Sequence, residues 1–107
     1  TKLIESSGNV FQDLGLPNPK ERLAKAGLAR QISKILKKRK LSQANAGELL
    51  GINQPKISAL LSGDLAGFST DRLILFLNLL ERDVDIVVKE KPVSRRYGNV
   101  HVISTIN

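Results

Sequence analysis

The sequence predicts a mainly α-helical domain, a bundle of four to five helices with one or two β-strands near its C-terminal end. Between residues 20 and 82, apolar residues recur every three or four positions, as on the buried face of a helix. After residue 83 they alternate with polar residues, as in a half-buried strand. A chain of 107 residues supports one domain with a modest core. We divide it into an N-terminal extension (1–19), a helical domain (20–82) and a C-terminal strand segment with a tail (83–107).

The N-terminal extension shows little periodicity. It contains two glycines and two prolines, and Asn9 could cap only a single helical turn before Gly15. Alone, such a segment buries too little apolar surface to be stable. It either packs on its own domain or becomes ordered on a partner, for which the candidate contacts are Phe11, Leu14 and Leu16.

A first long helix is expected from about Lys20 to Lys38, with Leu28, Ile32, Ile35 and Leu36 on its apolar face. This region also carries the excess charge of the chain. Residues 20–40 contain nine Lys and Arg and one acidic residue, whereas the other 86 residues contain eight basic and nine acidic ones. A solvated helix face usually mixes both signs. Positive charge concentrated in this way favours contact with nucleic-acid phosphates.

The stretch from Ser42 to Gly63 predicts two short helices joined by a tight turn. Ser42 is a good N-cap for a helix from Gln43 to Leu50, and Gly51 can take the positive φ that ends it. Asn53 is placed to cap a second helix that runs to about Leu61. Pro55 lies in the first turn of that helix, where a missing N–H does no harm, and Gly63 ends it.

The apolar residues of this stretch fall where two helices that cross at a steep angle must touch. These residues are Ala46, Leu50, Ile52, Ile57 and Leu60, and Gly47 provides a small residue where the second helix passes over the first. This pattern predicts a helix-turn-helix, whose second helix enters the major groove of DNA. An ordinary αα-hairpin is the alternative. The polar exterior of the second helix favours base contacts, for which the candidates are Asn53, Gln54, Lys56, Ser58 and Ala59.

These residues, in the form Ser-Gln…Gly-Ile…Pro-x-Ile-Ser, resemble the XRE-type helix-turn-helix of phage repressors and Cro-like proteins. The resemblance covers about residues 20–80. The wider chain, with NVFQDLGLPNP before the motif and GFSTDRLILFLNLLERDVDIVVKEKP after it, is similar to small XRE regulators related to the HigA-type antitoxins. Such proteins are often encoded beside a RelE-like toxin. The resemblance implies a repressor that binds a double-stranded DNA operator and serves as the antitoxin of a type II pair that autoregulates its operon.

In that family, residues that open the second helix make most base contacts, which here are Asn53, Gln54 and Lys56. Gln54 would be the principal reader, because a carboxamide can pair bidentately with adenine. Pro55 cannot donate a hydrogen bond, so readout beside it would be partly steric. Phosphate contacts are expected from basic and helix-start residues, namely Lys38, Arg39, Gln43, Ser62, Ser69 and Thr70.

The next helix is expected from Thr70 to about Glu81, with Ser69 or Thr70 as N-cap, and it is apolar on nearly every side. One stripe comprises Leu73, Phe76, Leu77 and Leu80, and Ile74, Leu75 and Leu79 cover much of the rest. A helix of this kind is covered on more than one side, and in a small domain the second cover is expected from another subunit. The alternating residues after it could pair with the same strand across a two-fold axis. The predicted homodimer interface therefore comprises Ile74, Leu75, Leu79, Val84, Ile86 and Val88.

A second alternation, Val100, Val102 and Ile106, could form another strand. The alternative to strand-mediated dimerisation is an intramolecular hairpin followed by a disordered tail.

Several function classes are disfavoured. The chain has no cysteine and one histidine, and it lacks a metal-ligand cluster and a Gly-rich phosphate loop, so we expect no metal, no cofactor, no small-molecule substrate and no enzymatic activity. No apolar run reaches the ~20 residues of a membrane span. A cytoplasmic location is expected. The remaining alternatives are a stand-alone XRE regulator without a toxin and an RNA-binding module, although the chain has few aromatic residues to stack on bases.

Overall fold

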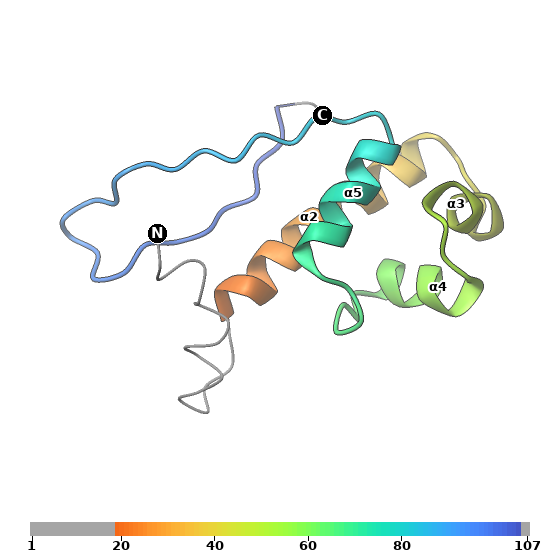
Figure 1. The fold of residues 1–107 in the computed structure, drawn as a ribbon, viewed down its shortest axis with the longest axis horizontal. Coiled ribbons are helices and arrows are strands. Elements are labelled where there is room, and N and C mark those ends of the chain that lie inside the picture. Colours follow the sequence, from red (N-terminus) through yellow and green to blue (C-terminus); the bar gives the residue numbers. More distant parts are fainter. Residues whose placement is uncertain (1–18, 106–107) are drawn as a thin grey trace.

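The computed structural model describes residues 19–105 of the chain as four helices followed by a long C-terminal segment. The helices are α2 (Pro19–Lys38), α3 (Gln43–Leu50), α4 (Gln54–Ser62) and α5 (Thr70–Leu79). α2 and α5 pack along one another, and α3 and α4 form a second pair beside them (Figure 1). The mainly α-helical bundle with a helix-turn-helix is confirmed. None of the helices within residues 19–105 is long and apolar enough to cross a membrane.

The caps expected from the sequence define the helix ends. Ser42 accepts a hydrogen bond from the Asn45 N–H and begins α3, and Gly51 ends it at φ 73°. Asn53 caps α4 in the same way, and Gly63 ends it at φ 87°. Each glycine adopts a left-handed conformation that other residues reach only with strain. The α5 cap is Ser69, which settles the choice between Ser69 and Thr70.

The core lies where the four helices meet. Its least exposed large side chains come from every helix except α3, and Phe68 adds an edge-on contact with the ring of Phe76, with 6.0 Å between centroids. The predicted apolar faces are buried as expected, apart from Ile52, which is half-buried. The buried residues predicted from the helical spacing are Leu28, Ile32, Ile35, Leu36, Ala46, Leu50, Ile57, Leu60, Leu73, Phe76, Leu77 and Leu80.

The expectation for Gly47 was wrong in one respect. A Cβ at this position would lie 2.7 Å from the backbone oxygen of Ile52, which belongs to the turn and not to α4. The Ile52 N–H also donates to the Gly47 carbonyl oxygen at 2.9 Å. Gly47 is therefore small because the chain folds back tightly after α3, before α4 begins.

The last helix ends earlier than the predicted limit of about Glu81. Glu81 has a φ of 64°, which is outside the helical range, and the Arg39 Nη2 donates to the Leu80 carbonyl oxygen at 2.9 Å. Arg39 also pairs with the Glu81 carboxylate at 3.2 Å. A guanidinium from the end of α2 thus satisfies a carbonyl that the end of α5 leaves without a helical partner.

The expected C-terminal strands do not form within one chain: no residue from 19 to 105 is in a strand. Residues 83–105 run out from the end of α5 and return beside α2 (Figure 1). Val84 and Val102 hold the two ends of this loop against the core. Because the outgoing and returning segments do not pair with each other, they lack the ladder that defines a strand. Ile106, the last residue of the predicted second strand, lies outside the described residues.

The returning segment approaches α2 at Gly27. A Cβ on Gly27 would lie 2.6 Å from the Cβ of Val102, too close for any other residue unless the segment moved. This contact explains a glycine in the middle of a helix, where it is otherwise unfavourable by ~1 kcal/mol relative to alanine.

Candidate nucleic-acid interface

The start of α4 presents an exposed polar surface. Gln54 and Ser58 are exposed on this helix, and Asn53 is exposed just before it. The Asn53 Oδ1 accepts a hydrogen bond from the Lys56 N–H at 3.0 Å, so this side chain caps the helix and leaves its NH₂ group for other contacts. The first turn of α4 is therefore both rigidly capped and open to an external partner.

Gln54 is held by the preceding helix. Its Nε2 donates to the Oε1 of Gln43 at 2.5 Å, and this contact joins the first residues of α3 and α4. Both side chains are exposed. The Gln54 amide keeps a free N–H and its carbonyl oxygen, which are the donor and acceptor needed for a bidentate contact with an adenine edge. The sequence identified both residues but did not reveal their contact, because it depends on the crossing of the two helices.

Lys56 points toward the α4–α5 loop. Its ammonium lies 3.5 Å from the Gly67 carbonyl oxygen and 5.2 Å from the centroid of the Phe68 ring. Ala59, another predicted base contact, is half-buried and packs against the core. Of the five predicted base-reading residues, Asn53, Gln54 and Ser58 have the freest access to an external partner.

The predicted phosphate contacts lie at three places: the starts of α3 and α5, the end of α4 and the end of α2. Gln43, Ser69 and Thr70 begin α3 and α5, where backbone N–H groups favour an anion. The Ser69 hydroxyl is used as the cap of α5, where it accepts from the Arg72 N–H at 3.1 Å. Ser62, at the other end of α4, is exposed and donates to the Ala59 carbonyl oxygen at 3.2 Å.

Lys38 and Arg39 stand at the end of α2, and both are exposed. The Arg39 guanidinium is engaged by Leu80 and Glu81, so it joins α2 to the end of α5. Sequence reasoning missed this role, because Glu81 is distant in the chain. Further exposed basic residues of the first helix and the turn after it are Arg22, Arg30, Lys34, Lys37 and Lys40.

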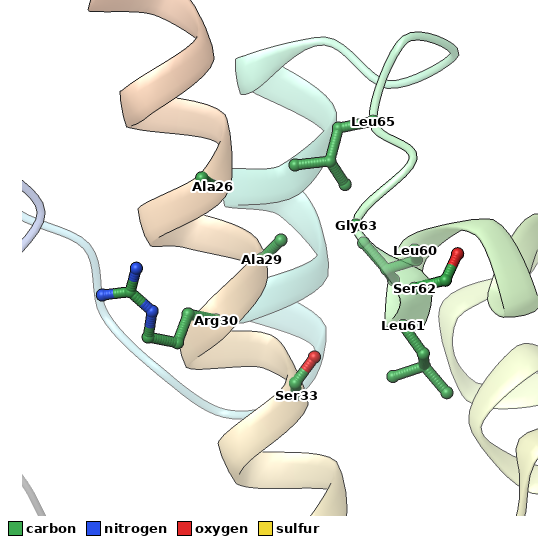
Figure 2. Close-up of a pocket in the computed structure, with 9 residues that line it drawn as sticks. All are labelled: Ala26, Ala29, Arg30, Ser33, Leu60, Leu61, Ser62, Gly63 and Leu65. Carbon is green, nitrogen blue, oxygen red and sulfur yellow. The ribbon is translucent and has the colours of Figure 1, made fainter.

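A shallow groove lies between α2 and the end of α4 (Figure 2). Small side chains line the α2 wall, and residues at and after the end of α4 line the other. Figure 2 shows the Arg30 guanidinium pointing away from the groove, so none of the described lining residues directs a titratable group into its interior. Its lining residues are Ala26, Ala29, Arg30, Ser33, Leu60, Leu61, Ser62, Gly63 and Leu65.

The residues assigned to a homodimer interface differ in exposure within one chain. Ile74 and Val84 are half-buried and pack against the core. Leu75, Leu79, Ile86 and Val88 are 53%, 42%, 78% and 81% exposed, respectively. The candidate toxin contacts Phe11, Leu14 and Leu16 lie outside the described residues.

Comparison with known proteins identifies the class. Residues 10–89 match a family model described as "Helix-turn-helix domain". A solved structure that bears the provisional description of an XRE family transcriptional regulator shares 44% sequence identity with the chain, at a TM-score of 0.77. The match covers 82% of this chain and 99% of that one. The chain therefore belongs to the XRE-type helix-turn-helix family. No curated protein matches it.

Proposed function

We propose that this protein is a transcriptional regulator that binds a specific operator in double-stranded DNA as a two-fold homodimer and represses transcription. The observation that carries the proposal is the exposed Gln54, held by Gln43 at the start of α4. A rigid carboxamide at the start of a recognition helix suits readout of an adenine in the major groove.

The electrostatics support the same proposal. Residues 20–40 carry nine basic side chains and one acidic one, and they lead directly into the helix-turn-helix. Phosphate contacts from the end of α2 and from the starts of α3 and α5 would position α4 in the groove without reading sequence. Two recognition helices related by a two-fold axis would contact half-sites about one helical turn, ~34 Å, apart.

Operator selection can be tested by fluorescence-anisotropy titration. The protein is titrated into duplex DNA from upstream of its own coding sequence and into random duplex DNA of the same length, each at two salt concentrations. We expect preferential binding to the upstream DNA at both salt concentrations. Equal, salt-sensitive binding to both duplexes would contradict operator recognition and leave only non-specific attraction to phosphates.

We further propose that the regulator is the antitoxin of a type II toxin–antitoxin pair and controls its own operon. Support comes from the similarity of residues before and after the helix-turn-helix to HigA-related regulators. The partner would be a RelE-like toxin, with Phe11, Leu14 and Leu16 as candidate contacts. The test is co-expression with the product of the adjacent gene: rescue of growth and co-purification are expected. Neither effect would be seen for a stand-alone regulator.

RNA binding is the alternative nucleic-acid function. Described aromatic side chains offer limited support for it: Phe68 and Phe76 are buried, and Tyr97, which is 61% exposed, already has the Lys20 and Arg96 side chains over its ring. Competition of the upstream duplex by single-stranded RNA would distinguish the two. We propose a cytoplasmic DNA-binding protein without enzymatic activity, metal or cofactor.

A further inference from the structure

Residues 83–91 leave the end of α5 and run away from the helices without a backbone partner among the described residues (Figure 1). Their sequence is Asp-Val-Asp-Ile-Val-Val-Lys-Glu-Lys. Ile86, Val87 and Val88 are 78%, 78% and 81% exposed. Three consecutive, β-branched apolar residues with unpaired backbone groups form a strand edge that is expected to pair with another chain.

The charges of this segment indicate that the partner strand comes from a second copy of the same chain. The acidic residues Asp83 and Asp85 precede Val87 by four and two positions, and Lys89 and Lys91 follow it by two and four. The segment therefore carries opposite charges at equal distances on either side of Val87. Two copies that run antiparallel are complementary to one another.

We propose that residues 83–91 of two copies of this chain pair as antiparallel strands about a two-fold axis at Val87. Asp85 then lies opposite Lys89 of the second copy, and Asp83 lies opposite Lys91 of the second copy. Each contact occurs twice because of the symmetry. Residues directly opposite in an antiparallel pair have neighbouring side chains on one face of the sheet, where opposite charges attract.

The charged side chains are available for these contacts. Among the described residues, Asp83, Asp85 and Lys89 have no hydrogen bond or ion pair from their side chains. The Lys91 ammonium donates to the Arg95 carbonyl oxygen at 2.7 Å and retains two further N–H donors.

The two-fold axis must pass through a residue and not between two residues. Residues directly opposite in an antiparallel pair lie on the same face of the sheet, and side chains alternate between faces along a strand. An axis between Ile86 and Val87, or between Val87 and Val88, would place residues of opposite faces against each other and is therefore excluded.

An axis at Ile86 is the closest competitor. It pairs Asp83 with Lys89 but leaves Asp85 opposite Val87, and a longer ladder would need residues 81 and 82. Glu81 has a φ of 64°, and the Arg82 guanidinium donates to the Leu80 carbonyl oxygen at 3.2 Å, so this part of the chain belongs to the end of α5. The axis at Val87 pairs all nine residues and both aspartates.

The pairing also accounts for the exposed apolar face of residues 83–91. Val84, Ile86 and Val88 lie on one side of an extended strand, and Val84 packs against the core. Ile86 and Val88 face the same way but lie beyond the helices of their own chain. Ile86 of each copy would contact Val88 of the other, and Leu75 and Leu79, both exposed on α5, are available to extend this apolar contact.

This inference rests on the homodimer in the proposed function and identifies its interface and register. The chain has no cysteine, so single cysteines introduced into the full chain report contacts cleanly. Val87→Cys would place its two copies opposite each other, near the separation that a disulfide spans. Val93→Cys is the matched control: it is the same change at a residue that is 99% exposed but lies six positions from the axis. Ile86→Cys tests the competing register.

Mild oxidation without DNA, followed by non-reducing electrophoresis, should yield mostly covalent dimer for Val87→Cys and little for the other two. Equal cross-linking of all three variants, faster cross-linking of Ile86→Cys, or a monomeric wild-type protein in sedimentation velocity would each overturn the pairing.

Charge reversal provides an independent test on exposed residues whose replacement should leave the fold intact. Asp85→Lys or Lys89→Asp alone places like charges opposite each other twice per dimer, and the dissociation constant of the dimer should rise about tenfold. The combined variant Asp85→Lys/Lys89→Asp should return it to near the wild-type value. If the combined variant is as weak as the two single changes together, the proposed contact does not exist.

Operator binding separates this inference from the function on which it rests. If Val87→Cys cross-links but no variant prefers upstream DNA, the pairing stands and the proposed function fails. If the protein binds its operator as a dimer but Val87→Cys does not cross-link, the register is wrong and the function stands.

Discussion

The side-chain amide of Gln54 donates to Gln43 Oε1 at 2.5 Å, and this hydrogen bond connects the first residue of α4 with the first residue of α3. It joins a predicted base reader to a predicted phosphate contact. A side chain restrained before binding loses less conformational entropy when it meets its target.

Replacing Gln54 with alanine should weaken binding to the cognate operator by ~1–3 kcal/mol and change binding to random DNA little, because the lost contacts are to base edges. Anisotropy titrations with both duplexes measure this difference. Gln43→Ala is the informative companion, since it leaves Gln54 in place but unrestrained, and it should have a smaller effect on base preference. Equal weakening on cognate and random DNA would contradict the role of Gln54 as a reader.

Replacing Lys38 with alanine should weaken binding to both duplexes by similar factors. A phosphate contact carries no sequence information, and its loss lowers the slope of log K against log salt by about one. Titration over several salt concentrations gives this slope. Lys25→Ala is a suitable control, because Lys25 already pairs with Glu21 at 3.4 Å. An unchanged salt slope for Lys38→Ala would exclude Lys38 from the phosphate contacts.

Replacing Lys56 with alanine should loosen the α4–α5 loop, because the ammonium lies near the Gly67 carbonyl oxygen and the Phe68 ring. Loss of the cation–π contact is expected to lower the free energy of unfolding by ~0.5–1 kcal/mol. Hydrogen exchange at residues 64–68 should become faster, whereas Ser58→Ala should leave it unchanged. A changed preference at one operator base pair with an unchanged loop would instead assign Lys56 to base readout.

Replacing Arg39 with alanine should destabilise the junction between α2 and the end of α5. The guanidinium satisfies the Leu80 carbonyl oxygen and pairs with Glu81, and a partly exposed contact of this kind is worth ~1 kcal/mol. Urea unfolding measures the loss. Glu81→Gln removes the ion pair while Arg39 can still donate to Leu80, so its effect should be smaller. Equal effects would assign the stabilisation to the ion pair.

Replacing Gly27 with alanine should displace the returning C-terminal segment from α2, because the new Cβ would lie 2.6 Å from the Cβ of Val102. The usual gain of ~1 kcal/mol for Gly→Ala within a helix should therefore be absent. Limited proteolysis should cut residues 99–103 faster than in the wild type. Gly98→Ala has open space around it and serves as the control. In a Val102→Gly background, Gly27→Ala should recover the helical gain in urea unfolding.

The local elements were predictable because their signals lie within a few residues of one another. Ser42 with Gly51 and Asn53 with Gly63 mark helix ends through contacts between near neighbours. The buried faces of α2 and α5 follow from helical periodicity, which is also local. The helix-turn-helix and its exposed first turn could therefore be identified before the helices were placed in space.

Contacts between distant residues required the folded chain. Arg39 reaches Leu80 across 41 positions, Val102 fills the space beside Gly27, and Lys56 lies beside Gly67. No periodic pattern encodes these pairs, because they depend on crossing angles and side-chain directions. The same reason explains the predicted strands: residues 83–91 alternate as a strand does, but a ladder requires a second backbone.

By itself, the sequence determined the four helices, most of their caps, most of the core residues and the segment that carries the excess positive charge, since these depend on local spacing and composition. Only the tertiary structure decided which polar side chains near the helix starts are hydrogen-bonded to a neighbouring helix, which contact a neighbouring loop and which are free to contact a partner. The physical reason is that a side chain's access to DNA depends on what packs beside it: Gln43 restrains Gln54, whereas the α4–α5 loop draws Lys56 away.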